Sequence, residues 1–169
     1  SGFALQNELH YFSTFLQPSC YTISGFSYGA IQALHKTIEM LKEGRRVDTL
    51  VLISPAFFQN RDAKFKKLQR IAFASDKEFY LSNFIDSCFL PHERGEVELG
   101  ECSARELDEL LEYEWIEDEL LFLVQRGVAI ELYLGEKDAI VDAAAVKEFF
   151  LPYATVTTMQ NGNHFLRTL

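Results

Sequence analysis

Tyr21-Thr22-Ile23-Ser24-Gly25-Phe26-Ser27-Tyr28-Gly29-Ala30 is the stretch that decides the fold. A short apolar run leads into Gly-x-Ser-x-Gly, and apolar residues then recur at helical spacing. This pattern is typical of a nucleophile elbow, a sharp turn between a strand and a helix with a serine at its tip. The positions two before and two after the serine crowd each other, so both need small residues, as Gly25 and Gly29 are. We therefore expect Ser27 to be a nucleophile, and the N–H of Tyr28 to help to stabilise an oxyanion.

Strands and helices alternate on both sides of this stretch, which predicts an α/β fold with a mostly parallel sheet and helices on both faces. The run at 49–53 is apolar almost throughout, as expected for a strand buried on both faces. The strand at the C-terminal end is weaker than the others, so we expect it near an edge. The predicted strands are 21–24, 49–53, 128–134 and 154–159, and the predicted helices around them are 6–16, which Pro18 ends, 28–42 and 142–151.

Helical patterns fill the region between the second and third of these strands. The length of 169 residues fits one domain, so we expect a hydrolase-like core of residues 1–59 and 127–169 with a small helical cap inserted at 60–126. Inside the cap, Ser75-x-x-Glu78 and Ser103-x-x-Glu106 predict two helix starts of the capping-box type. The polar segment 91–101 lacks periodicity and predicts a mobile loop.

The composition is that of an ordinary globular protein, with 48% apolar and 24% charged residues. A formal net charge of −9 argues against a nucleic acid partner. No apolar run is long enough to span a bilayer, and no basic-then-apolar leader is visible, so we expect no membrane association. The three cysteines match no metal-ligand spacing, which predicts free thiols in a reducing compartment. We expect a cytoplasmic monomer without metal or cofactor.

The charge is unevenly distributed along the chain. Residues 92–119 carry twelve acidic side chains and two basic ones. Residues 61–70 carry five basic side chains and one acidic side chain. A solvated helix face explains either block by default, but a basic island on an acidic protein is also a candidate for docking an acidic partner. The basic side chains are Arg61, Lys64, Lys66, Lys67 and Arg70.

Ser27, Asp138 and His164 each directly follow a predicted strand. The carboxyl ends of parallel strands lie along one rim of a sheet, so we expect these residues to meet there. Serine needs a base to accept its proton, the histidine fits that role, and the aspartate would orient the imidazole. Alone, the aspartate would be read as a helix cap and the histidine as a surface residue. Asp142 is the better candidate for the cap, and the chain order Ser, Asp, His is that of α/β-hydrolases.

Several segments resemble a particular group of α/β-hydrolases: the short pimeloyl-acyl-carrier-protein methyl ester esterases of biotin synthesis, the BioV type. The similar segments are Ser1-Gly2-Phe3, Ser24 to Ile31, Phe65-Lys66-Lys67-Leu68-Gln69 and Leu134 to Asp138. The resemblance extends over nearly the whole chain. It implies removal of the methyl group from pimeloyl-carrier-protein methyl ester, with release of methanol. Relatives place a strand before the oxyanion segment, so either residues preceding Ser1 are absent from this sequence or that strand is very short.

The resemblance also implies roles for individual residues. Ser27, Asp138 and His164 match the catalytic triad. Phe3 matches the position whose backbone N–H joins that of Tyr28 in the oxyanion hole. Phe65, Leu68 and Gln69 match cap residues that line the acyl channel, and Lys64 matches a basic position that meets the acyl carrier protein. The predicted docking residues are Arg61, Lys64, Lys67 and Arg70.

Two other functions remain open on the sequence alone. A general short-chain esterase or thioesterase would use the same three residues and differ only in its pocket and docking surface. A hydrolase-fold protein that serves as a binding module would have no need of an intact Ser-Asp-His set, which argues against that alternative.

Overall fold

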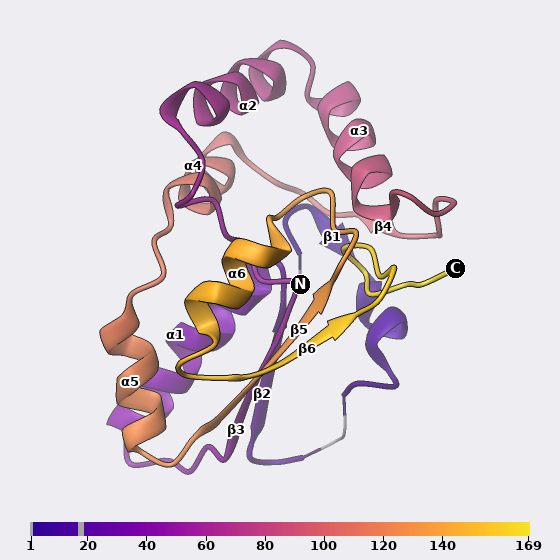
Figure 1. Ribbon diagram of the computed structural model, residues 1–169. Helices are drawn as coiled ribbons and strands as arrows, with labels where there is room; N and C mark the ends of the chain where they lie inside the picture. The colour runs from indigo at the N-terminus through magenta and orange to yellow at the C-terminus, as the bar shows by residue number, and fades with distance from the viewer. Residues whose placement is uncertain (1, 17–18) are drawn as a thin grey trace.

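Four parallel strands form the central sheet in the computed structural model, which describes residues 2–16 and 19–169 (Figure 1). Their order is β2-β3-β5-β6, so β6 lies at an edge, as predicted. The bounds are Thr22–Phe26 for β2, Thr49–Ile53 for β3, Ala129–Gly135 for β5 and Thr155–Met159 for β6. The α/β class with a parallel sheet is confirmed. The predictions for Ser1 and Pro18 lie outside the described residues.

Alternate residues of β3 are buried on the two opposite faces of the sheet. On one face, Leu50 and Leu52 pack into a core with α1 (Tyr28–Lys42), α5 (Glu117–Gln125) and α6 (Ala143–Phe150). On the other, Val51 and Ile53 pack with the end of α3 (Lys77–Phe89), with Phe12 and with Phe165. The strand is apolar on both faces because both faces are covered.

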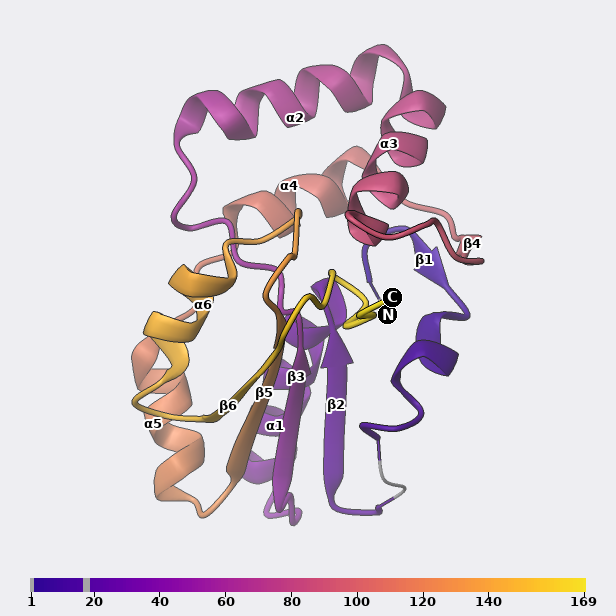
Figure 2. The same cartoon turned by 45° about the vertical axis from the view of Figure 1, so that its right-hand side comes forward.

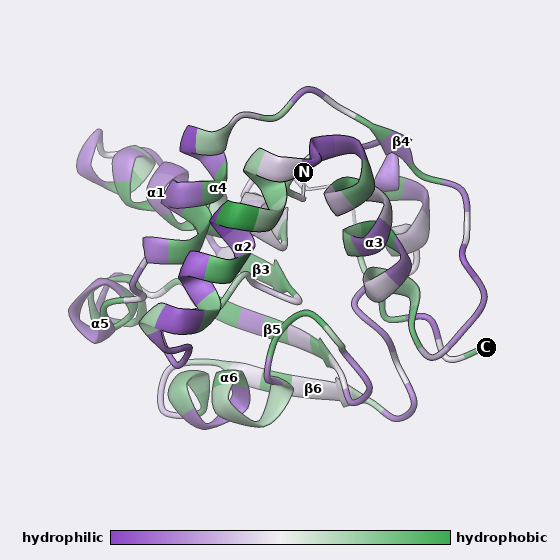
Figure 3. Ribbon diagram, turned by 90° about the horizontal axis from the view of Figure 1, so that it is seen from above, coloured by the Kyte–Doolittle hydropathy of each residue, from purple (hydrophilic) through white to green (hydrophobic). Residues whose placement is uncertain are grey.

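Three helices form a layer above the carboxyl ends of the strands: α2 (Ala63–Ser75), α3 and α4 (Ala104–Glu112) (Figure 2). Seen from above, α2 lies beside α4, and α3 lies on the opposite side of this helical layer (Figure 3). The division into core and cap stays a prediction, but α5, inside the range 60–126, packs against β5 in the sheet layer. No helix among the described residues is both long and apolar enough to cross a membrane.

The predicted helix over 6–16 is wrong. The structure has instead a short strand, β1 (Leu5–Gln6), and a 3-10 helix, η1 (Glu8–Phe12). Asn7 separates them with a left-handed backbone, φ 60°, which a helix cannot continue through. β1 pairs antiparallel with β4 (Glu98–Leu99), which lies inside the segment predicted as a loop. Pairing with a distant segment decided this region, and local sequence does not encode such pairing.

Of the two predicted capping boxes, the second is confirmed. Ser103 Oγ accepts from the Glu106 N–H at 3.2 Å, and the Glu106 carboxylate accepts from the Ser103 N–H at 2.7 Å. The first is wrong by one residue. Ser75 is the last residue of α2, and the carboxylate of Asp76 caps α3 by accepting from the Phe79 N–H at 3.0 Å. Aspartate caps a helix as well as serine does, so residue type does not distinguish Ser75 from Asp76. The position of the turn between α2 and α3 determines which of the two is the N-cap.

Candidate active site

Ser27 occupies the turn between β2 and α1, with φ 52° and ψ −117°. This positive φ is a strained conformation for a residue with a side chain. The turn is tight: a Cβ on Gly25 would lie 2.2 Å from the carbonyl oxygen of Gly29. The Ser27 N–H donates to the Ile53 carbonyl at 2.9 Å, which ties the elbow to β3. The small residue predicted at position 25 is thus required by the backbone itself.

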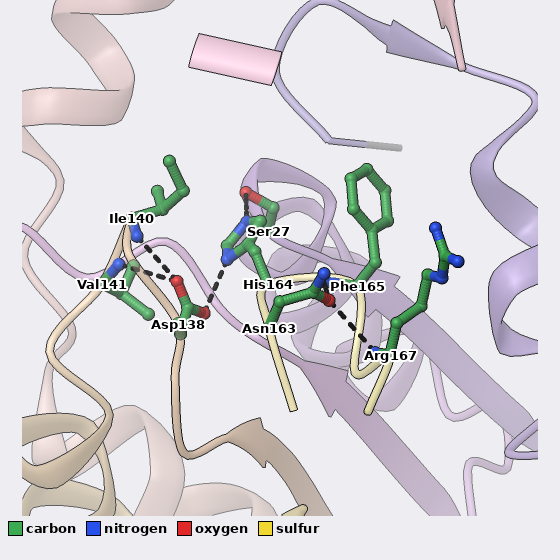
Figure 4. A network of polar contacts seen from close by, with 8 residues as sticks. All are labelled: Ser27, Asp138, Ile140, Val141, Asn163, His164, Phe165 and Arg167. Atoms are coloured by element: carbon green, nitrogen blue, oxygen red, sulfur yellow. Dashed lines mark hydrogen bonds and ion pairs between the residues drawn. The ribbon is translucent and has the colours of Figure 1, made fainter. Parts of the chain in front are cut away.

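His164 follows β6 in a turn that Asn163 holds together. The fully buried Asn163 side chain accepts from the N–H groups of Phe165, at 3.0 Å, and Arg167, at 3.1 Å (Figure 4). Its amide donates to the Phe89 carbonyl at 2.8 Å. Sequence reasoning missed Asn163 as a site residue, although its place in an Asn-Gly-Asn run is a turn signal.

Gly135 is a second residue that sequence reasoning missed as part of the site. A Cβ at this position would lie 2.1 Å from the Asn163 carbonyl oxygen. The glycine therefore allows the histidine turn to approach the end of β5. It precedes Asp138 by one short turn, so it brings two of the predicted residues toward each other.

Ser27, His164 and Asp138 form one hydrogen-bonded row (Figure 4). His164 Nε2 lies 3.1 Å from Ser27 Oγ, and Nδ1 lies 2.7 Å from Asp138 Oδ2. The other carboxylate oxygen of Asp138 accepts from the N–H groups of Ile140, at 2.8 Å, and Val141, at 3.1 Å. The His164 and Asp138 side chains are fully buried. The carboxylate accepts a hydrogen bond from Nδ1–H, and this tautomer leaves Nε2 free to accept from the serine hydroxyl.

Asp142 serves a different purpose. It is the N-cap of α6, where its carboxylate accepts from the N–H groups of Ala144 and Ala145, both at 3.1 Å. Of the two carboxylates, only Asp138 forms a hydrogen bond with His164 in the described part of the chain. The geometry thus separates two aspartates that are four residues apart.

Phe3 and Tyr28, the predicted oxyanion-hole residues, border the same small polar hollow of about 240 Å³. Neither backbone N–H donates to another residue within 2–16 and 19–169. A buried or half-buried N–H without an acceptor is available to a ligand oxygen. Their role in binding an oxyanion stays a prediction.

A cavity of about 340 Å³ lies between the cap and the rim of the sheet. It reaches the rim at Ala139 and Ile140, directly after Asp138, although Ser27 and His164 are not among its lining residues. Phe65 and Gln69, which the resemblance assigns to an acyl channel, line this cavity, and their role in binding substrate stays a prediction. Its lining residues are Phe3, Phe58, Arg61, Phe65, Gln69, Ala72, Tyr80, Asn83, Phe84, Ser87, Leu107, Leu110, Leu111, Ala139 and Ile140.

Leu68 does not line this cavity, contrary to its prediction. Its side chain is 53% exposed. Phe65, Gln69 and Ala72 share the face of α2 that points to the cavity, and Leu68 lies on the neighbouring row of the helix, toward solvent.

The predicted docking residues divide into three groups. Arg61 lines the cavity. Arg70 is engaged in ion pairs with Asp108, at 2.6 Å, and with Glu112, and the hydrogen bonds that its guanidinium donates to these carboxylates raise its pKa. Lys64 and Lys67 are exposed, and no described carboxylate forms an ion pair with either. The surface available to a partner is therefore smaller than the basic block of the sequence.

The cysteines offer no second nucleophile at this site. All three are free thiols, and Cys88 is fully buried close to Asp138. Burial, together with the Asp138 charge, raises the pKa of the Cys88 thiol well above its ordinary value. The thiol is then protonated and unreactive. Within the described ranges, no three His, Cys, Asp or Glu side chains are grouped so as to hold a metal ion.

The protein has the α/β-hydrolase fold. Similar solved structures are a naproxen esterase from Bacillus subtilis, a bromoperoxidase from Bacillus anthracis and an esterase from Exiguobacterium antarcticum. Their sequence identities are 17%, 16% and 17%, and their TM-scores are 0.53, 0.61 and 0.63. The matches cover 86%, 85% and 85% of this chain and 53%, 60% and 59% of those chains. This chain thus spans less than two thirds of the length of these structures. No protein-family model and no curated protein matches the sequence.

Proposed function

We propose that this protein is a serine hydrolase of carboxylic esters. The observation that carries the proposal is the row Ser27–His164–Asp138, in which hydrogen bonds of 3.1 and 2.7 Å connect hydroxyl, imidazole and carboxylate. An unperturbed serine hydroxyl is a weak nucleophile, and an adjacent oriented base activates it. The fold is shared with solved structures whose names include esterases, which supports this reaction class by analogy.

The reaction follows from the row of side chains. Ser27 Oγ attacks the ester carbonyl carbon while His164 Nε2 accepts the hydroxyl proton, and the resulting oxyanion lies near the N–H groups of Phe3 and Tyr28. The C–O bond to the alcohol then breaks, and His164 returns the proton to the leaving alcohol. A water molecule, deprotonated by His164, attacks the acyl-serine. The bond from Ser27 Oγ to the acyl carbon then breaks, His164 returns the proton to Ser27 Oγ, and the carboxylic acid is released. Asp138 stabilises the imidazolium in both halves.

We further propose that the substrate is the methyl ester of a pimeloyl chain on an acyl carrier protein, with methanol and pimeloyl-carrier protein as products. The segments that resemble pimeloyl-carrier-protein methyl ester esterases support this, and so does an apolar cavity beside Asp138. Acyl carrier proteins are strongly acidic, and Lys64 and Lys67 offer exposed positive charge on the outside of the cap.

The substrate is tested by comparing hydrolysis of two methyl esters: pimeloyl methyl ester on its carrier protein, and free dimethyl pimelate. Ser27→Ala is the blank for both. A strong preference for the carrier-bound ester is expected. Equal or faster turnover of the free ester would contradict the carrier-protein substrate and indicate a general esterase. Hydrolysis that the blank retains would contradict the proposed reaction itself.

Docking is tested by reversing the two free charges with Lys64→Glu/Lys67→Glu. We expect kcat/KM for the carrier-bound ester to fall about tenfold at low salt, a loss of about 1.4 kcal/mol, and to fall less as salt rises. Turnover of dimethyl pimelate should not change. The matched control is Lys42→Glu/Lys147→Glu, which makes the same change of charge on α1 and α6. Equal losses in both double variants would show a general charge effect and no docking site.

A further inference from the structure

Arg61 is the one charged side chain among the residues that line the cavity between the cap and the sheet. It lies directly before Asp62, the N-cap of α2, and its guanidinium stacks over the Phe65 ring, 5.2 Å from the ring centre. The surroundings are mostly aromatic and aliphatic. A positive charge in such surroundings is costly unless acceptor oxygens compensate it.

The described residues provide no such compensation. No carboxylate in 2–16 or 19–169 forms an ion pair with Arg61, and its buried Nε has no hydrogen-bond partner. In contrast, Arg70, nine residues further along the basic block, has two carboxylate partners. Guanidinium carries five donors and no acceptor, so an unpaired one calls for oxygen ligands.

Two other polar side chains at the cavity wall, Tyr80 and Ser87, are already engaged. Tyr80 Oη donates to Gln69 Oε1 at 3.0 Å, and Ser87 Oγ donates to the Asn83 carbonyl at 2.8 Å. The cavity therefore combines an apolar wall with one unsatisfied cationic donor. This combination suits an apolar chain that carries an oxygen acceptor away from the bond to be cleaved.

We propose that Arg61 determines specificity by binding an oxygen acceptor at the far end of the substrate's acyl chain. The substrate class is then esters whose acyl chain ends in a second carbonyl or carboxylate, in preference to plain alkyl chains. The inference rests on the proposed ester hydrolysis at Ser27. It differs from the sequence-based expectation for Arg61, which was contact with the carrier protein at the surface.

The kinetic test uses three methyl esters of equal acyl length: monomethyl pimelate, dimethyl pimelate and methyl heptanoate. Arg61→Met keeps most of the stem and removes the charge. We expect it to lower the ratio of kcat/KM for the first two esters over methyl heptanoate by about 10- to 100-fold, the size of a hydrogen bond to a charged group. Lys147→Met, which removes an exposed charge from α6 away from the cavity, should leave both ratios unchanged.

Each ratio compares substrates within one variant, so a partly unfolded variant does not disturb it. A larger loss for monomethyl pimelate than for dimethyl pimelate identifies a carboxylate as the ligand of Arg61. Equal losses for these two esters identify a carbonyl. Either result supports the proposal. Unchanged ratios in Arg61→Met, or the same change in Lys147→Met, would overturn it.

A binding measurement separates this inference from the proposed reaction. In a Ser27→Ala background, calorimetry gives the affinity for each of the three esters with and without Arg61→Met. Selective weakening of the two oxygen-ended esters supports the role of Arg61 even if no ester is hydrolysed by the parent protein. If Arg61→Met leaves the affinity for each ester unchanged, the role of Arg61 is overturned even if the parent protein hydrolyses esters rapidly.

Discussion

At the rim of the sheet, backbone contacts place the side chains, whereas in the cap the side chains themselves hold the helices. Ser27 is fixed by a Gly25–Gly29 contact and a bond to Ile53, and the carboxylate of Asp138 is held by two N–H groups. The cap is held by apolar packing and by partly exposed ion pairs between α2 and α4. The rim thus suits chemistry that needs fixed geometry. The cap suits selection of a substrate, which side-chain changes can adjust.

The largest expected effect is at the rim. Ser27→Ala or His164→Ala should lower kcat for ester hydrolysis on the order of a million-fold, as in other serine hydrolases, since the two residues act as a unit. The double variant should be no worse than either single one. Hydrolysis assays and labelling by a fluorophosphonate probe measure this. Labelling of a Ser27→Ala variant would place the nucleophile elsewhere.

The next effect separates two aspartates. Asp138→Asn should lower kcat by about 10⁴-fold, because an amide no longer holds the His164 tautomer that accepts the serine proton. Asp142→Asn should leave kcat nearly unchanged, since asparagine also caps a helix well. The comparison uses the same assay under the same conditions. An inactive Asp142→Asn with an active Asp138→Asn would reverse our assignment of the acid.

Two glycine substitutions test whether backbone contacts fix the geometry of the rim. Gly25→Ala should lower the free energy of unfolding by at least about 3 kcal/mol, because its Cβ would meet a backbone oxygen that cannot move aside. Gly44→Ala, where φ is +75° and nothing lies within 4 Å, should cost only about 1 kcal/mol for the left-handed backbone. Urea unfolding measures both. Equal costs would mean that the elbow has room to adjust.

The smallest effect is expected in the cap. Hydrogen bonds from Arg70 and Lys66 lower the pKa of Glu112 below its ordinary 4.5. Glu112→Gln should therefore lower the free energy of unfolding at pH 7 by about 0.5 kcal/mol, the size of an exposed ion pair. A lowered pKa stabilises the folded state above pH 4.5, so the difference should vanish as pH falls through the folded pKa. Exposed Glu114→Gln is the control; an equal loss there would contradict a specific pair.

The parts of the fold that sequence predicted well are those that local pattern encodes. The bounds of α1 and β3 were predicted correctly because their periodicity and flanking glycine or serine signals are local. The region 6–16 was mispredicted because Asn7 and the pairing of β1 with β4 interrupt an otherwise helical pattern. Similarly, the sequence pattern predicted Ser75 as the N-cap of α3, and the structure has Asp76, one residue later, in that position.

The sequence by itself determined that Ser27, Asp138 and His164 follow strands of one parallel sheet, since strand periodicity and the elbow motif are written in neighbouring residues. Only the tertiary structure decided which basic residues remain free. It pairs Arg70 with α4, directs Arg61 into the cavity and leaves Lys64 and Lys67 in solvent. The physical reason is that an ion pair or a cavity wall depends on side chains some 40 residues apart, and no local pattern specifies their meeting.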